Sequence, residues 1–244
     1  MRIAVIIPAL DEERSLPKVL ADVPRNLVSE VVVVDNGSRD RTAEVAKAAG
    51  ATVLSEPRAG YGQACLTGIA YLETAPPEIV VFVDGDYSDR ASEMAALVTP
   101  IVQGKADFVV GSRVLGKRER GALAPHARSG NWLATRLIRL LYGYRFTDLG
   151  PFRAIRYETL LALDMRDRDY GWTAEMQARA ARSGVRCAEV PVSYHRRIGR
   201  SKITGTVKGT VMAGYKILTT IVRVRLEGSL APAAPRVKAQ NIHA

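Results

Sequence analysis

A pair of aspartates separated by one glycine follows a short apolar run in the first half of the chain. Asp84, Gly85 and Asp86 come directly after the run 79–83 (IVVFV). Such a run predicts a strand buried on both faces, and its end lies at the sheet edge where open α/β folds bind ligands. Two carboxylates at this spacing can converge on one divalent cation, and oxygen-only ligands favour Mg²⁺ or Mn²⁺ shared with phosphates. An isolated Asp-Gly-Asp is also typical of an ordinary turn, so the choice between a cation site and a turn depends on other features of the sequence.

Acidic residues also follow two earlier strand-like runs. The runs 2–7 and 30–34 lead into acids at 11–13 and 35–40. Further strands at 51–54 and 107–110 alternate with helical patterns near 16–23, 41–49, 63–73 and 91–103, and Asp40 is the expected N-cap of the second helix. This alternation predicts a parallel, doubly wound sheet, whose strands all end at one edge. Three acidic strand ends at one edge predict a single site.

A glycine-rich turn precedes the helix expected at 63–73. Its sequence, Gly60-Tyr61-Gly62-Gln63-Ala64, places two glycines where a helix begins. Backbone N–H groups at such a turn can bind a phosphate, although glycines before helices are common and the signal is weak.

The second half of the chain is basic and less regular. The expected elements are a mobile loop at 116–130, an amphipathic helix at 131–142, a turn and strand at 147–156, helices at 158–163 and 173–183, a strand pair at 185–194 interrupted by Pro191, and a basic amphipathic helix at 206–226. The cation-rich segment 195–202 (HRRIGRSK) suits phosphate, with a solvated linker as the alternative. Helix 131–142 could lie on a membrane, but packing on the sheet is the commoner arrangement.

Composition narrows the classes of partner. The 244 residues carry a net charge of +10, which suits a polyanion such as nucleic acid, an anionic membrane or a phosphorylated substrate. Aromatic residues make up only 6%, so a stacking surface for single-stranded nucleic acid is weakly supported. Two cysteines give no disulfide framework and indicate a reduced, cytoplasmic setting. We expect neither a signal peptide nor a transmembrane helix.

In order and spacing, the motifs resemble those of the family 2 glycosyltransferases, and more narrowly those of the dolichyl- or polyprenyl-phosphate mannose and glucose synthases. The resemblance covers about residues 1–215 and rests on PALDEE at 8–13, VVVVDNGSRDRT at 31–42, GYGQA at 60–64, DGD at 84–86, GSR at 111–113, DLGPFRAI at 148–155 and RIGRSKITGT at 197–206. It implies a GT-A fold, an α/β, Rossmann-like, mostly parallel sheet flanked by helices. One domain, 1–226, would join a nucleotide-sugar half (1–113) to an acceptor half (114–226), with a disordered tail at 227–244.

The resemblance also implies residue roles. The residues expected to bind the nucleotide sugar are Pro8, Ala9, Leu10, Glu12, Asp35, Asn36, Gly62, Gln63, Asp84, Gly85, Asp86, Arg197, Ser201 and Lys202. Mg²⁺ or Mn²⁺ would be held by Asp84 and Asp86 with Ser88, and Arg113 and Arg128 would receive an acceptor phosphate. Asp86, Arg113 and Lys202 would serve catalysis. Many members have Asp where this chain has Asn36, and many carry transmembrane helices after the catalytic domain.

The expected reaction is inverting transfer of glucose or mannose from a UDP- or GDP-hexose to a polyprenyl phosphate. A phosphate monoester is already anionic near neutral pH and needs no strong base. Glu175 and Asp148 are candidate bases for a hydroxyl acceptor, although a surface position on its helix is the favoured interpretation of Glu175.

Other classes of function stay open at this point. One is a soluble family 2 glycosyltransferase acting on a small hydroxyl or phosphate acceptor. Another is a non-catalytic module that binds nucleotide sugars or nucleic acid, although nucleic acid is not the expected partner. A third is a nucleotidyltransferase on a similar fold. The expected location is cytoplasmic, with possible peripheral contact at the inner face of the cell membrane.

Overall fold

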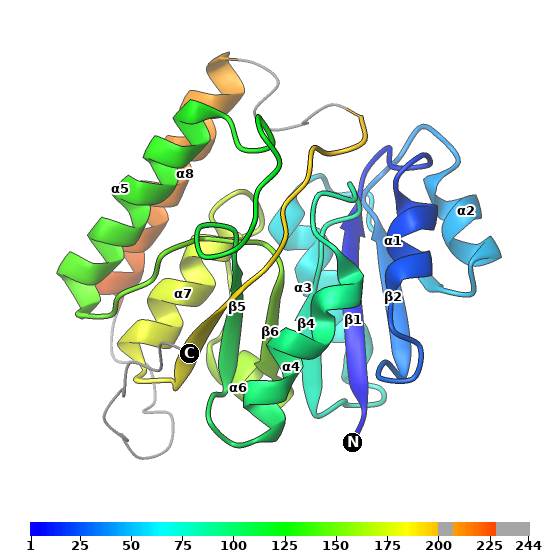
Figure 1. The fold of residues 1–244 in the computed structure, drawn as a ribbon, viewed down its shortest axis with the longest axis horizontal. Coiled ribbons are helices and arrows are strands. Elements are labelled where there is room, and N and C mark those ends of the chain that lie inside the picture. Colours follow the sequence, from blue (N-terminus) through cyan, green and yellow to red (C-terminus); the bar gives the residue numbers. More distant parts are fainter. Residues whose placement is uncertain (200–206, 228–244) are drawn as a thin grey trace.

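Residues 1–199 and 207–227 are described by a computed structural model, in which they form one sheet with helices on both faces (Figure 1). The strands are β1 (Ile3–Ala9), β2 (Glu30–Asp35), β3 (Thr52–Ser55), β4 (Ile79–Phe82), β5 (Phe108–Ser112), β6 (Arg153–Arg156) and β7 (Cys187–Pro191). Their order is β3-β2-β1-β4-β6-β5-β7. The predicted doubly wound, mostly parallel sheet is therefore confirmed.

One strand runs against the others. β6 pairs antiparallel with both β4 and β5, whereas the other pairs are parallel. Before β6 the chain returns to the sheet near the carboxyl end of β5, where the backbone N–H of Arg113 donates a hydrogen bond to the Asp148 carboxylate. A strand that enters from that edge has to run in the opposite direction.

Helices cover the two faces of the sheet in separate groups. They are α1 (Leu16–Asp22), α2 (Thr42–Ala48), α3 (Tyr61–Leu72), α4 (Met94–Val102), α5 (Pro125–Tyr142), α6 (Tyr157–Ala162), α7 (Trp172–Arg182) and α8 (Val207–Leu226), with a short 3-10 turn at Ala91–Glu93. α1, α2 and α4 share a core with Ile3, Val5 and Ile7 of β1. α3 and α5 to α8 share a second core with Ala4 and Ile6 of the same strand. Alternate residues of a strand face opposite sides, so burial on both faces produces the continuous apolar runs of the sequence.

Several boundaries differ from the predictions. The loop expected at 116–130 is wrong for its last six residues, because α5 begins at Pro125, a residue suited to the first helical turn. Arg41 rather than Asp40 is the N-cap of α2, although the Asp40 carboxylate still accepts a hydrogen bond from Thr42 N at 2.9 Å. The strand pair expected at 185–194 is one strand that ends at Pro191. The predicted tail at 227–244 lies outside the described residues, apart from Glu227.

The helices α5 and α8 lie side by side at one lateral side of the sheet, away from β1 and β2 (Figure 1). The Tyr142 hydroxyl of α5 donates a hydrogen bond to the Ile221 carbonyl of α8. Both helices leave large apolar side chains in solvent, among them Trp132 and Leu140 on α5 and Tyr215 on α8. No described helix is long and apolar enough to cross a bilayer.

Candidate active site

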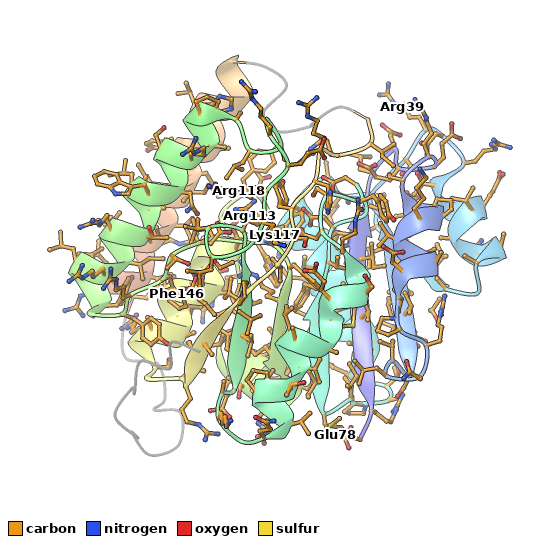
Figure 2. The ribbon with its side chains drawn as sticks, in the orientation of Figure 1. Arg39, Glu78, Arg113, Lys117, Arg118 and Phe146 are labelled. Carbon is orange, nitrogen blue, oxygen red and sulfur yellow. The ribbon has the colours of Figure 1, made fainter. Side chains whose placement is uncertain are left out.

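Three strand ends meet at one edge of the sheet, as predicted. The Asn36 N–H that follows β2 donates to the Ala9 carbonyl at the end of β1, and β1 also pairs with β4. Figure 2 shows Arg39 and Arg113 toward this edge and Glu78 at the opposite one. The loops after these strands are therefore brought together at the carboxyl ends of β1, β2 and β4.

The acids after β1 and β2 join loops to one another. Asp11 Oδ1 accepts a hydrogen bond from Arg39 N at 2.8 Å, and Glu13 Oε2 pairs with Arg41 Nε at 3.4 Å. Asp35 Oδ1 accepts from Ser38 N at 3.2 Å. Within residues 1–199 and 207–227, no three His, Cys, Asp or Glu side chains converge as a metal site. These acids are therefore engaged in loop contacts, and Asp84 and Asp86 after β4 are the candidate pair for a cation. That the three acidic strand ends form one site stays a prediction.

Asp84 and Asp86 are close, partly desolvated carboxylates. Asp84 Oδ1 accepts a hydrogen bond from the Tyr61 hydroxyl at 2.9 Å. Asp86 is 4% exposed, and its Oδ2 lies 3.1 Å from Arg197 NH2. Burial, followed by the negative charge of Asp86, raises the pKa of Asp84 to about 6. A bound cation would relieve this repulsion, and an oxygen-only donor set beside buried Ser88 fits Mg²⁺ or Mn²⁺.

Asp89 is a third acid of this rim that the sequence analysis did not single out. It is fully buried, and neither carboxylate oxygen has a hydrogen-bond partner in the described part of the chain. Burial raises its pKa well above the usual range, and Asp84 and Asp86 add to the effect. The spacing 84, 86, 89 was the available signal. This orphaned carboxyl group therefore favours its neutral form, and it would contribute negative charge to the rim only beside a bound cation or a cationic side chain.

The turn that links these acids has an unusual backbone. Tyr87 has φ 64°, a left-handed conformation that bulky residues rarely adopt. Its ring is covered by the Arg90 guanidinium, whose central carbon lies 3.9 Å from the ring centroid. Gly85 packs against Pro8 and Ala9, where a Cβ would be in ordinary contact. The turn is therefore fixed both by stacking and by the end of β1.

Asn36 holds the loop that follows β3. Its side-chain amide donates to the Glu56 carbonyl at 2.9 Å and the Arg58 carbonyl at 2.7 Å, and its oxygen accepts from Gly60 N at 2.9 Å. A carboxylate has no N–H to donate and would repel both carbonyls. The asparagine, where many family members have aspartate, is therefore explained by the shape of this loop.

Glu56, also missed in the sequence, anchors the same loop to α3. Its carboxylate accepts hydrogen bonds from Thr67 Oγ1 at 2.6 Å, Gln63 Nε2 at 2.8 Å and Arg58 N at 2.9 Å. These bonds, led by the one from Thr67, lower the pKa of Glu56 to about 2. The side chain of Gln63 is therefore bonded to Glu56. The three partners lie 2, 7 and 11 residues from Glu56, across the loop between β3 and α3, and no helical or strand period marks them in the sequence.

The glycine-rich turn packs against protein. Gln63 N donates to the Arg168 carbonyl at 2.9 Å, and Gly60 N is held by Asn36. A Cβ on Gly62 would lie 2.1 Å from the Asp167 carbonyl oxygen. The interpretation of this turn as a phosphate-binding site is corrected for these amides, because the glycines permit close contact with residues 167–168.

Arg113 and Asp148 form a buried, two-pronged ion pair. Arg113 Nε and NH2 lie 2.8 and 2.7 Å from the two Asp148 oxygens. The Asp148 side chain is fully buried, and that of Arg113 is 12% exposed. Asp148 is therefore engaged by a cation, which does not suit the general base considered for it. Arg113 presents only a small part of its guanidinium to solvent.

Glu175 differs from both interpretations of the sequence. It is fully buried, so the surface position is wrong. Its Oε1 pairs with Arg179 at 2.9 Å, and its Oε2 accepts from the N–H groups of Arg166 and Asp167. Both carboxylate oxygens are thus occupied by donors of the protein, which does not suit the general base considered for Glu175.

A cavity of about 520 Å³ lies between α5, the segment after β5 and the segment 145–147. The arginines that line it are Arg118, Arg128, Arg136, Arg139 and Arg145. No Asp or Glu lines it, and none of these guanidinium groups pairs with a described carboxylate. Apolar side chains, including Val114, Leu123, Trp132 and Phe146, complete the wall. Figure 2 shows Arg118 and Phe146 on this side of the sheet. Of the predicted acceptor residues, Arg128 lines the cavity, whereas Arg113 immediately precedes its lining residue Val114.

The remaining predicted site residues are distributed around the rim. Pro8 and Ala9 are buried at the end of β1, whereas Leu10 and Glu12 are half-buried after it. Arg197 reaches the rim through Asp86. Ser201 and Lys202 lie outside the described residues. The rim thus brings together Asp84, Asp86 and Arg197, which come from two distant segments.

Comparison with known proteins identifies the family. The model for glycosyl transferase family 2 matches residues 4–162. The chain belongs to glycosyl transferase family 2. This glycosyltransferase is 38% identical over 216 residues to an uncharacterized glycosyltransferase of Mycobacterium tuberculosis, covering 86% of this chain and 94% of that one. It is 30% identical over 222 residues to the undecaprenyl-phosphate mannosyltransferase of Micrococcus luteus, covering 86% and 90% of the two chains. It is 32% identical over 232 residues to a dolichyl-phosphate hexose transferase of Haloferax volcanii, covering 93% and 96%.

Solved structures support the fold of this glycosyltransferase. The glucosyl-3-phosphoglycerate synthase of Mycobacterium tuberculosis, in complex with Mn²⁺, UDP and phosphoglyceric acid, superposes with a TM-score of 0.70 at 23% identity. The match covers 92% of this chain and 78% of that one. The expected GT-A fold and family are confirmed.

Proposed function

We propose that this glycosyltransferase moves a hexose, with inversion, from a nucleoside diphosphate sugar to a polyprenyl phosphate. The donor would be a UDP- or GDP-hexose carrying glucose or mannose. Residues 1–113 would bind the donor and 114–226 the acceptor, within one domain. The observation that carries the proposal is the arginine-lined cavity, because it combines cationic and apolar walls beside an acidic rim.

The acidic rim would bind the donor diphosphate through a divalent cation. Asp84 and Asp86 would hold Mg²⁺ or Mn²⁺, with Ser88 as a further contact, and the ion would neutralise charge on the leaving nucleotide. Arg197, which lies 3.1 Å from Asp86, is placed to add a second positive charge there. The pocket for base and ribose would lie along the ends of β1 and β2. There, Pro8, Ala9, Leu10 and Glu12 neighbour Asp35 and Asn36. Lys202 and Ser201 would complete the set from the segment after Arg197.

The cavity suits an acceptor with an anionic head and an apolar tail. Guanidinium groups bind phosphate oxygens in a two-pronged manner, and the apolar walls would contact an isoprenoid chain. Arg128 would bind the acceptor phosphate in the cavity, and Arg113 would do so at its border with the rim. The α5 wall is held in place by Asn131, whose side chain bonds the backbone of Thr147 and Leu149.

The proposed reaction needs no general base from the protein. The acceptor phosphate is anionic near neutral pH, since its second pKa is about 6, and its oxygen can attack the anomeric carbon directly. Both candidate bases, Asp148 and Glu175, are held by arginines. Catalysis would then consist of positioning and charge stabilisation by Arg113, Asp86 and Lys202.

A polyprenyl acceptor requires access to a membrane. Trp132 (58% exposed) and Leu140 (80%) on α5 and Tyr215 (65%) on α8 extend the apolar wall of the cavity onto an outer face. Together with the unpaired arginines of the cavity, this face suits the surface of an anionic membrane. We therefore infer a cytoplasmic enzyme that binds the inner membrane surface peripherally.

Donor binding can be tested by thermal unfolding with a panel of nucleotide sugars, each with and without Mn²⁺. A ligand that binds only the folded state raises the melting temperature, so one nucleotide sugar should stand out and should depend on Mn²⁺. Asp86→Asn should abolish the Mn²⁺-dependent shift. A panel in which no nucleotide shifts the melting temperature contradicts a donor site at this rim.

A second candidate is transfer to a small phosphorylated acceptor. It is favoured by the likeness to a synthase solved with phosphoglyceric acid. Turnover of the selected donor with undecaprenyl phosphate in detergent and with 3-phosphoglycerate separates the two. Faster turnover with 3-phosphoglycerate than with undecaprenyl phosphate would mean that the cavity binds a small phosphorylated acceptor. Donor binding without turnover of either acceptor, together with retention of nucleic acid by Asp86→Asn, would instead support a binding module.

A further inference from the structure

The loop 164–171 lies between α8, the last helix of the described residues, and the first turn of α3. On the α3 side its backbone is in very close contact. A Cβ on Gly60 would lie 2.1 Å from the Arg168 carbonyl oxygen, and one on Gly62 would lie 2.1 Å from that of Asp167. Gln63 N also donates to Arg168 O at 2.9 Å. Backbone atoms cannot move aside as a flexible side chain can, so a shift of this loop must shift the start of α3.

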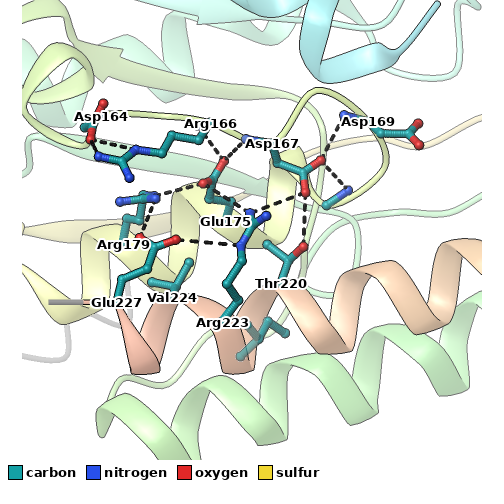
Figure 3. A network of polar contacts seen from close by, with 12 residues as sticks. Asp164, Arg166, Asp167, Asp169, Glu175, Arg179, Thr220, Arg223, Val224 and Glu227 are labelled. Carbon is teal, nitrogen blue, oxygen red and sulfur yellow. Dashed lines mark hydrogen bonds and ion pairs between the residues drawn. The ribbon is translucent and has the colours of Figure 1, made fainter.

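On the other side, Asp167 ties the loop to α8 (Figure 3). Its carboxylate is almost fully buried, at 2% exposure. Oδ1 accepts from the loop N–H groups of Asp169 at 2.8 Å and Gly171 at 3.2 Å. Oδ2 accepts from the Thr220 hydroxyl at 3.1 Å and lies 3.6 Å from the cationic nitrogens of Lys216 and Arg223. One carboxylate thus bonds the loop with one oxygen and α8 with the other.

A buried neighbour reinforces this junction. Glu175 of α7 accepts from the Asp167 N–H at 2.7 Å and pairs with Arg179, which also bonds Glu227 at 2.7 Å. Arg223 lies within 3.6 Å of both Asp167 and Glu175. Figure 3 shows these side chains gathered between α7 and α8. The side chains of Asp167, Glu175 and Arg179 are buried, so the Glu175–Arg179 pair is little screened by solvent. Lys216 and Arg223 are 39% and 46% exposed, so their pairs with Asp167 are screened more, and the loop is held mainly by the buried groups.

The first turn of α3 ends at the acidic rim. Its first residue, Tyr61, donates a hydrogen bond from its hydroxyl to Asp84 Oδ1 at 2.9 Å. This bond leaves Asp84 Oδ2 for a cation and fixes the rotation of the carboxylate. A continuous series of contacts therefore runs from α8 through Asp167, the backbone of 167–168 and Tyr61 to Asp84.

We propose that Asp167 and Tyr61 are positioning residues for the metal and donor site, and that docking of α8 thereby sets the geometry of Asp84. The metal and donor part rests on the proposed function, whereas the link from α8 to α3 does not. A partner that moves α8 would change donor binding through these contacts. The loop 164–171 would then transmit a movement of α8, in the acceptor half, to α3, in the donor half.

The test compares Asp167→Asn, Thr220→Val and Tyr61→Phe with the wild-type chain. Asp167→Asn keeps the oxygen that bonds the loop but loses the charge that faces α8. Asp164→Asn is the matched control, because Asp164 is an exposed acid of the same loop that pairs only with Arg166 among the described residues. Melting temperatures establish that each variant is folded.

The first readout is hydrogen exchange, which needs no metal or donor. Amides 61–65 at the start of α3 should exchange about tenfold faster in Asp167→Asn and in Thr220→Val, and not in Asp164→Asn. Unchanged exchange at 61–65 in both folded variants would overturn the link from α8 to α3.

The second readout is the dissociation constant of Mn²⁺ in the presence of UDP or GDP. Hydrogen-bond partners of metal ligands typically contribute 10- to 100-fold in affinity, so Tyr61→Phe should weaken Mn²⁺ binding about tenfold. Asp167→Asn should weaken Mn²⁺ binding as well. In the double variant Asp167→Asn with Tyr61→Phe, the loss of affinity should be less than the sum of the two single losses, because both substitutions act through the Tyr61–Asp84 hydrogen bond. Additive effects would show that Asp167 is only structural. Faster exchange with unchanged Mn²⁺ affinity would overturn the rim part of the proposal. A wild-type chain that binds no Mn²⁺ would contradict the proposed function and this rim part, while exchange still decides the link to α3.

Discussion

The rim after β4 and the cavity beside α5 carry opposite charge, so the rim would attract a cation and the cavity would attract an anion. The rim holds Asp84, Asp86 and the orphaned Asp89, with Arg197 as a nearby cation. The cavity is lined by arginines without a single acid among the described lining residues. Unpaired like charges cost stability, so each set indicates a ligand of the opposite sign.

The Arg113–Asp148 pair lies on the border between the two regions. Arg113 follows β5 directly before the cavity residue Val114, and Asp148 follows the cavity residue Thr147. The charges of Asp89 and Asp148 both act on Arg113. A buried ion pair therefore separates the acidic rim from the basic cavity.

The largest expected effect comes from breaking this border. Arg113→Ala leaves the buried Asp148 carboxylate without its cation, which should lower the free energy of unfolding by about 3–5 kcal/mol. Urea unfolding followed by tryptophan fluorescence measures the loss. Arg166→Ala, which breaks an exposed pair with Asp164, is the control and should cost less than about 1 kcal/mol. A loss that small at Arg113 would mean that the Arg113–Asp148 pair contributes little to the stability of this border.

The next effect tests the acidic region alone. Asp86→Asn should reduce metal-dependent turnover roughly 100-fold or more, because it removes charge from the proposed cation site. Stability should change little, since the substitution also relieves repulsion with Asp84. Turnover is measured at saturating Mn²⁺, with Glu78→Gln at the opposite end of the sheet as control (Figure 2). Full turnover in Asp86→Asn would place the metal elsewhere.

The acidic region was largely predictable from the sequence, and the basic one was not. Strands buried on both faces produce apolar runs, and the acids that follow them, such as Asp84, are local in sequence. The cavity arginines come from separate segments, from Arg118 to Arg145, and only folding brings them together. The first turn of α5 was missed because Gly130 and its basic neighbours are typical of a loop.

Long-range polar contacts were equally invisible. Asn36 bonds a carbonyl 22 residues away, and Thr220 bonds Asp167 across 53 residues. A side chain that serves such a contact has no periodic signature, so Glu56 and Asp167 could not be distinguished from surface acids. Glu175 was misassigned to the surface because two of its donors, the N–H groups of Arg166 and Asp167, lie in a loop outside α7.

A smaller effect tests the basic region alone. The double variant Arg136→Glu and Arg139→Glu reverses two charges of the cavity, which should raise the KM for a polyprenyl phosphate about tenfold or more and weaken binding to anionic vesicles. Mn²⁺-dependent donor binding should be unchanged. The control, Arg25→Glu with Lys47→Glu, reverses two charges on the far side of the sheet. An equal increase in KM and an equal loss of vesicle binding in both double variants would mean that the cavity arginines act only through the net charge of the protein.

The smallest effect concerns a carboxylate beneath the border. Glu189 of β7 accepts hydrogen bonds from Thr147 N and Oγ1 and from Asp148 N, and burial raises the pKa of Glu189 to about 7. In the unfolded chain the pKa of a glutamate is about 4.3. Between these pH values the folded protein keeps a proton that the unfolded chain has lost, so this group stabilises less as the pH rises toward 7.

Glu189→Gln removes this titration and retains an oxygen that can accept from Thr147 and Asp148. From pH 5 to pH 8 the wild-type chain should therefore lose about 1–2 kcal/mol relative to the variant, with partial exposure reducing the full linkage value. Urea unfolding at pH 5, 6, 7 and 8 measures the difference. Parallel stability curves would mean that Glu189 is ionised throughout. The segment 147–148 would then be held by an ionised Glu189, and the border between cavity and rim would carry one further negative charge.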